Sequence, residues 1–100
     1  MAVEHLVCMK LRHPVPEEQL KSLYRECEAS FDEIPGILTA SMGENWHADA
    51  SGFTHAIVIR LEDRGRLDLF MSHPAHVAAG RLLQSVFSEF IILDYETERP

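Results

Sequence analysis

Two segments of this sequence are apolar at every successive position: residues 56–59 read Ala-Ile-Val-Ile, and residues 90–93 read Phe-Ile-Ile-Leu. Side chains along a strand alternate between the two faces of its sheet, so strands of this kind are apolar on both faces. Such a sheet needs a layer over each face, because a large exposed apolar patch promotes association. If helices cover one face, a second copy of the chain can cover the other, and we therefore expect a homodimer.

The first third of the chain predicts a strand followed by an amphipathic helix. Residues 3–11 alternate in the pattern of a strand, which places Val3, His5, Val7, Met9 and Leu11 on one face. Pro16 and the two glutamates after it suit the first turn of a helix. Apolar residues at helical spacing then continue to the Pro35-Gly36 break: Leu20, Leu23, Tyr24, Cys27, Phe31 and Ile34.

The remaining segments complete a recognisable order of elements. We expect a strand over residues 37–42, a polar connection over 44–52, a strand over 53–61 and a strand over 90–93. Asp63 fits the cap of a short helix ending at residue 71, and Pro74 fits the first turn of a helix containing Leu82, Leu83, Val86 and Phe87. The order β, α, β, β, α, β is the ferredoxin-like arrangement, an α+β fold.

Composition narrows the class of protein. The chain has 100 residues, 46% of them apolar, which suits one small domain with one core. Its formal net charge of −7, without a basic cluster, argues against nucleic acid or an anionic membrane as partner. No apolar run approaches the length of a membrane span, and the N-terminus does not resemble a signal peptide. Two unpaired cysteines fit a reduced compartment, and we expect a cytoplasmic protein.

Histidines are the candidate chemical groups. His73-Pro74-Ala75-His76 places an imidazole at a helix start, where we expect His73 to order the turn. His5 and His55 lie near strand starts, so three groups that titrate near neutrality can converge in one fold, as acid–base catalysis requires. The alternative for each is structural: His76 bonded to nearby backbone, and His5 and His55 as satisfied core residues.

Five short motifs, taken together, resemble those of the stress-responsive A/B barrel family. They are Glu4-His5-Leu6-Val7, Ile34-Pro35-Gly36, Gly52-Phe53-Thr54-His55, His73-Pro74-Ala75-His76 and Asp94-Tyr95. The family consists of small dimeric α+β barrels in which two ferredoxin-like sheets pack face to face. The resemblance covers nearly the whole chain and implies one such domain over residues 1–100.

Within that family the chain is similar to polyketide cyclases, which close a linear poly-β-ketone by intramolecular aldol condensation without a cofactor. This similarity implies that His76 is the general base and that His5 and His55 lie in or beside an apolar cavity. It also implies cavity-lining positions, most of which periodicity places on the helix-facing side of the sheet: Val7, Met9, Leu23, Tyr24, Cys27, Phe70, Phe87, Phe90 and Ile92.

Phe70 departs from the cyclase pattern, in which a tyrosine hydroxyl lies beside the base. A phenyl ring donates no hydrogen bond to a developing oxyanion, and losing one such donor typically costs about 2.7 to 4 kcal/mol of transition-state stabilisation. Tyr24, on the helix face that the pattern turns to the cavity, can supply a hydroxyl from another direction.

Three other interpretations stay open at this stage. Phe70 favours a non-catalytic barrel that binds a hydrophobic ligand in a stress response. Cofactor-free oxygenation occurs in other dimeric α+β barrels, although no motif here selects it. A metal site made of His5, His55 and His76 is less favoured, because no helix carries the His-Glu-x-x-His spacing. Arg60, Arg64 and Arg66 either attract an anionic group at a pocket mouth or are ordinary surface charges.

Overall fold

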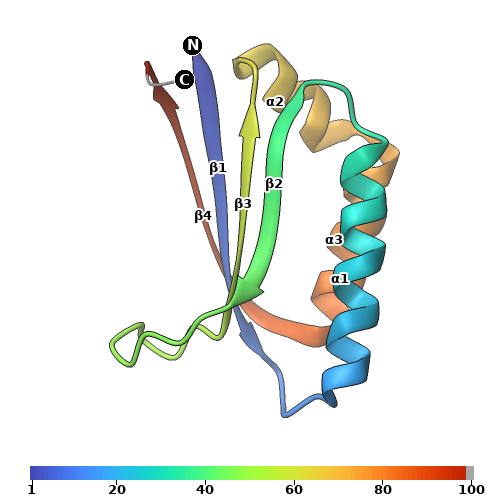
Figure 1. The fold of residues 1–100 in the computed structure, drawn as a ribbon, viewed down its shortest axis with the longest axis vertical. Coiled ribbons are helices and arrows are strands. Elements are labelled where there is room, and N and C mark those ends of the chain that lie inside the picture. Colours follow the sequence, from blue (N-terminus) through green and yellow to red (C-terminus); the bar gives the residue numbers. More distant parts are fainter. Residues whose placement is uncertain (99–100) are drawn as a thin grey trace.

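Helices cover one face of a four-stranded antiparallel sheet in the computed structural model, which describes residues 1–98 (Figure 1). The elements are β1 (Ala2–Leu11), α1 (Glu17–Asp32), β2 (Ile37–Glu44), β3 (His55–Leu61), α2 (Arg64–Ser72), α3 (Pro74–Val86) and β4 (Phe87–Thr97). The strand order is β2-β3-β1-β4, so the chain's first and last strands are neighbours. The predicted ferredoxin-like α+β fold is confirmed.

β1 lies in the interior of the sheet and carries its alternation into the core. His5 is paired with Ile59 of β3 on one side and with Asp94 of β4 on the other. Directly opposed residues of antiparallel strands share a face, so these side chains all point toward the helices. Val3 and His5 are each only 2% exposed, and Met9 is fully buried. The strand's odd-numbered residues therefore form the floor of the core.

Capping side chains divide the segment after β3 into two helices. Asp63 accepts a hydrogen bond from the backbone N–H of Arg66 at 2.8 Å and so begins α2. His73 lies between α2 and α3, and its Nδ1 accepts a hydrogen bond from the N–H of Ala75 at 3.0 Å. The expectation that His73 orders this turn is confirmed. The break at His73-Pro74 places His76 in the first turn of α3.

Several strand boundaries differ from the sequence-based expectation; β2, for example, continues to Glu44 rather than ending at residue 42. β4 begins at Phe87 rather than residue 90 and continues to Thr97, because it pairs with β1 along the whole length of both strands. Phe87, expected in the preceding helix, is extended and fully buried. β3 begins at His55 rather than residue 53, since the N–H of Phe53 instead closes a turn onto the carbonyl of Ala50.

The face of the sheet away from the helices is uncovered and partly apolar (Figure 1). Val58 of β3 is 39% exposed, and Ile91, Leu93 and Tyr95 of β4 are each about half exposed. Leu6 and Cys8 of β1 lie between them in the sheet register. This open face, defined by these six residues, is the second apolar face that the sequence pattern predicts. Among residues 1–98, no helix combines the length and apolarity needed to cross a bilayer.

We expect Gly36→Ala to lower the free energy of unfolding by about 1 to 3 kcal/mol, because a left-handed residue is replaced by one that is strained there. Gly36 has φ +93°, and a Cβ at this position would lie 2.6–2.8 Å from the side chain of Arg66. Gly80→Ala, inside α3 with no atom within 4 Å of the added Cβ, is the matched control and should stabilise by about 0.5 to 1 kcal/mol. Urea unfolding followed by circular dichroism measures both, and equal midpoints would contradict the expectation.

Candidate functional site

His5 and Asp94 form a pair across the β1–β4 ladder. The Nδ1 atom of His5 lies 2.5 Å from Oδ1 of Asp94, and a carboxylate can only accept, so Nδ1 carries the proton. The ring of His5 is 2% exposed, whereas the side chain of Asp94 is 41% exposed. Asp94 therefore fixes the orientation and tautomer of a buried imidazole from the solvent side, leaving Nε2 of His5 for other partners.

His76 is oriented by backbone rather than by a carboxylate. Its Nδ1 lies 2.9 Å from the carbonyl oxygen of Met71, which can only accept, so Nδ1 is the protonated nitrogen. The Nε2 atom of the neutral ring then carries a free lone pair. Burial lowers the pKa of His76 below 6.5; the hydrogen bond to Met71 opposes this shift, and the charge of nearby His5 adds to it. At neutral pH His76 is therefore a neutral imidazole with a basic nitrogen.

Phe70 lies between the two imidazoles. Its ring centroid is 5.4 Å from that of His5 and 4.4 Å from that of His76, and the residue is 1% exposed. The three rings line a cavity of about 40 Å³, whose other walls come from β1, β3, α1 and α3: Val7, Ile57, Ile59, Phe31, Ala79, Gly80 and Leu83. A volume of this size holds about one water molecule or one small polar group.

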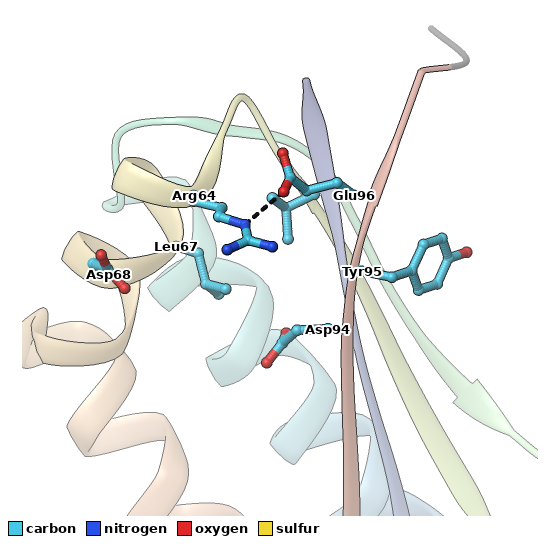
Figure 2. Close-up of a pocket in the computed structure, with 7 residues that line it drawn as sticks. Arg64, Leu67, Asp68, Asp94, Tyr95 and Glu96 are labelled. Carbon is cyan, nitrogen blue, oxygen red and sulfur yellow. Dashed lines mark ion pairs between the residues drawn. The ribbon is translucent and has the colours of Figure 1, made fainter.

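A second, open pocket of about 330 Å³ adjoins this pair between α2 and the upper ends of β1 and β4 (Figure 2). Figure 2 shows Asp94 turned toward the helices and Tyr95 turned to the opposite side of β4. Arg64 at the pocket rim is 2.6 Å from the carboxylate of Glu96. Since Asp94 lines this pocket and also binds His5, it connects solvent to the buried imidazole.

His55 does not join this group, although we expected three histidines to converge. It is opposite Met9, four residues along β1 from His5, which corresponds to about 13 Å of strand. The ring packs instead against Phe87 at 5.3 Å and Tyr24 at 6.3 Å between centroids. Tyr24 is consequently beside His55 rather than beside His76. A metal site built from all three histidines is incompatible with this separation, and no metal-binding group of three side chains occurs within residues 1–98.

The hydrogen bonds of Thr54 fix the tautomer of His55. The hydroxyl of Thr54 accepts from the N–H of Leu11 and donates to the carbonyl of Met9, so it can only accept from Nδ1 of His55, 2.9 Å away. Nε2 is then a lone pair, and it has no hydrogen-bond partner in the described chain. Burial lowers the pKa of His55, with the charge of Glu44 opposing the shift.

Most of the expected cavity-lining residues fill the core instead of enclosing a chamber. Met9, Leu23, Cys27 and Phe87 belong to the packed hydrophobic cluster between the sheet and the helices, and Phe90 packs against it. Ile92, on the edge strand, is 51% exposed. Of the expected set, only Val7 and Phe70 line the 40 Å³ cavity. We expected an apolar pocket between sheet and helices; aromatic side chains such as Phe31, Phe70 and Phe87 fill much of that volume, and a cavity of about 40 Å³ remains there.

Two further expectations concern cysteine and arginine. Burial, with the nearby charges of Glu26 and Glu28, raises the pKa of the Cys27 thiol to about 11, which disfavours a nucleophilic thiolate.

The arginines considered for anion binding are each held by a carboxylate: Arg60 by Glu4, Arg64 by Glu96 and Arg66 by Glu62.

Asp94 is the functional residue that sequence reasoning did not assign to the site. It was noted as part of a motif, but only the β1–β4 register places it opposite His5. A signal was available: His5 and Asp94 both fall on the helix-facing side once the two strands are paired. The role of Met71 could not be predicted from its residue type, because it is the backbone carbonyl of Met71 that orients His76.

Comparison with known proteins identifies the family of this chain. The profile of the stress responsive A/B barrel domain matches residues 3–97. The chain belongs to this family. Olivetolic acid cyclase of Cannabis sativa is 26% identical over 101 residues, which cover 95% of this chain and 96% of the cyclase.

Solved structures of other proteins share the A/B barrel fold. A dimeric ferredoxin-like protein of unknown function from Bacteroides fragilis is 25% identical, with a TM-score of 0.75 and 96% of each chain covered. Hydroxynitrile lyase from Passiflora edulis has a TM-score of 0.85 at 16% identity, covering 98% of this chain and 95% of the lyase. At 16% identity, the similarity to the lyase shows only that the two proteins share a fold.

The lowered pKa of His76 predicts a measurable titration. In NMR spectra, the Cε1–H signal of His76, assigned by its loss in His76→Gln, should titrate with a midpoint below 6.5. Because the unfolded chain binds this proton more tightly, the corresponding stability is present above pH 6.5 and is lost as the pH falls toward the folded-state pKa. A midpoint at or above 6.5 would contradict the burial of this ring.

Proposed function

We propose that this A/B barrel protein is a small-molecule enzyme of the lyase or cyclase type, in which His76 is the general base. The observation that carries the proposal is the pairing of Nδ1 of His76 with the carbonyl of Met71, which leaves Nε2 as the basic nitrogen of a partly buried ring that lines the 40 Å³ cavity together with Phe70 and His5. A neutral imidazole of lowered pKa is suited to remove an acidic proton from carbon at neutral pH. The similarity to a polyketide cyclase supports a poly-β-ketone as substrate.

The first stage of the proposed cyclisation is an intramolecular aldol addition. Nε2 of His76 takes a proton from a methylene between two carbonyls, and the resulting enolate carbon attacks a ketone carbonyl of the same molecule. The carbon–carbon bond forms as the ketone becomes an alkoxide, and the alkoxide recovers the proton from the imidazolium. His5, held by Asp94, can accept a hydrogen bond from an enol hydroxyl of the substrate through its Nε2 lone pair. His55 is assigned no part in proton transfer, because it lies elsewhere along the sheet.

We place different parts of the substrate in the two volumes. The 40 Å³ cavity admits one carbonyl group, whereas the 330 Å³ pocket beside Asp94 has room for an extended chain. The outer pocket is lined by Asp68, Asp94 and Glu96, with Arg64 as its only cation. A neutral polyketone segment fits this lining better than a free carboxylate does.

We further propose that the protein is a homodimer formed through the open face. The open face is an apolar surface on a sheet whose other side is already packed, which is the usual signature of an association surface. The Bacteroides fragilis relative, at 25% identity, is described as dimeric. A second copy placed over the open face gives the two-layered barrel that the family name describes.

A binding protein without catalysis is the second candidate, and one observation favours it. Phe70 occupies the position beside His76 and offers no hydrogen-bond donor to a developing oxyanion. In that case the imidazoles serve to hold a polar group of a hydrophobic ligand.

His76→Ala should lower the rate of cyclisation of a reactive tetraketide thioester by about 100- to 10,000-fold, as expected for loss of a general base. Products are quantified by mass spectrometry against a reaction without protein. His13→Ala, in the exposed connection between β1 and α1, is the matched control and should keep full activity. Circular dichroism checks that both variants fold. Full cyclisation by His76→Ala would remove His76 from the mechanism.

Phe70→Tyr tests the missing donor. A tyrosine hydroxyl at this position enters the 40 Å³ cavity between the two imidazoles, where it can donate to an oxyanion. Turnover should rise by about 100-fold if that donor limits the reaction, since one oxyanion donor is worth about 2.7 to 4 kcal/mol. An unchanged product mixture together with saturable ligand binding by both proteins would favour the binding protein instead.

A further inference from the structure

Trp46 is the most exposed large apolar side chain in the described part of the chain. It is 92% exposed, and it is the single tryptophan of the sequence. Tryptophan is depleted from freely solvated surfaces and is among the residues that contribute most to protein–protein binding. An almost fully exposed tryptophan therefore indicates a surface that another molecule covers.

The segment that carries Trp46, residues 45–53, is held in shape by its own hydrogen bonds. Nδ2 of Asn45 donates to the carbonyl of Phe53 at 2.9 Å, and Oδ1 of Asn45 accepts from the N–H of His47 at 3.0 Å. The ring of His47 in turn accepts from the N–H of Asp49 at 3.1 Å. Trp46 is thus displayed on an organised loop, and little entropy is lost when such a loop binds.

The same loop is anchored to the sheet at its base. The backbone N–H of Asn45 donates to the carbonyl of Thr54 at 2.8 Å, and the N–H of Thr54 donates to the carbonyl of Met9 at 2.8 Å. The ammonium of Lys10 lies 4.8 Å from the centroid of the Phe53 ring. The direction in which the loop leaves the sheet is consequently fixed by contacts with β1.

The loop of residues 45–53 leaves the sheet on the side away from the helices. In Figure 1 the loop between β2 and β3 extends beyond the sheet on the side opposite α1 and α3, which is the side of the open face. Loop and sheet together form a groove of about 460 Å³ whose apolar walls include Cys8, Ala50, Phe53, Ala56, Val58 and Ile91. The groove is continuous with the open face, since Cys8, Val58 and Ile91 belong to both.

We infer that residues 45–53 form a clasp for a second copy of this chain, with Trp46 packed on the partner copy and the groove filled by it. The inference rests on the homodimer proposed above, because whatever covers the open face must also meet a loop that overhangs it. A two-fold axis makes the contact twice, which doubles its contribution. A chain of net charge −7, with Asp49 in the loop itself, is a poor match for an anionic membrane.

The single tryptophan makes the clasp directly observable. The full-length protein is diluted in steps, its mass is followed by analytical ultracentrifugation, and Trp46 fluorescence and acrylamide quenching are recorded at each step. We expect a dimer whose Trp46 emission is blue-shifted and protected from quenching, and a red shift as dilution yields monomer. Trp46→Ala should weaken dimerisation by roughly 30-fold or more, the loss expected for one interface hot spot. Leu69→Ala, at a 58% exposed position on α2, is the control and should leave it unchanged.

The other possible results distinguish failure of the clasp from failure of the homodimer. A stable dimer in which Trp46 remains quenchable, and which Trp46→Ala does not weaken, overturns the clasp while leaving the homodimer in place. A monomer at every concentration overturns both. A monomer whose fluorescence shifts only when anionic phospholipid vesicles are added assigns Trp46 to a membrane contact and overturns the clasp.

Discussion

The pairing of β1 with β4 is the interaction on which the rest of this molecule depends. It joins the two ends of the chain, from Ala2 opposite Thr97 to Leu11 opposite Phe87. A slip of one residue would turn every side chain of one strand to the other face. Asp94 would then leave His5, and the apolar residues of the open face would exchange places with the core residues of β4. The same register therefore determines both the candidate site and the surface on which we place a second copy.

The break between α2 and α3 is the second constraint, and it acts on the chemistry directly. His73 caps α3, Pro74 prevents α2 from continuing, and the change of direction allows the carbonyl of Met71 to reach the ring of His76. Met71 lies in the last turn of α2, where backbone carbonyls have no partner within the helix. A structural feature, the unsatisfied end of a short helix, thus fixes which nitrogen of His76 is basic.

Sequence patterns predicted the fold well because that information is local. The alternation of residues 3–11, the helical spacing from Leu20 to Ile34, and the signals at Asp63 and Pro74 each depend on neighbours within a few positions. The length of β4 was underestimated because its ends are less apolar and are held by pairing with β1. His55 was placed with His76 because pattern analysis gives the face of a strand but not the distance along it. The size of the pocket could not be predicted from the pattern, because side-chain volumes decide packing and Phe31, Phe70 and Phe87 leave a small cavity between sheet and helices.

Access to His76 follows from the same packing. The inner cavity is walled by Phe70 of α2, and the outer pocket is walled by Leu67 and Asp68 of the same helix. α2 is held in place by Phe70, its single buried residue, by Leu67 packed against the core, and by the carbonyl of Met71 on the ring of His76. Phe70, the residue that departs from the cyclase pattern, is therefore also a wall of the inner cavity, so its size matters to ligand binding as much as its missing hydroxyl matters to the proposed catalysis.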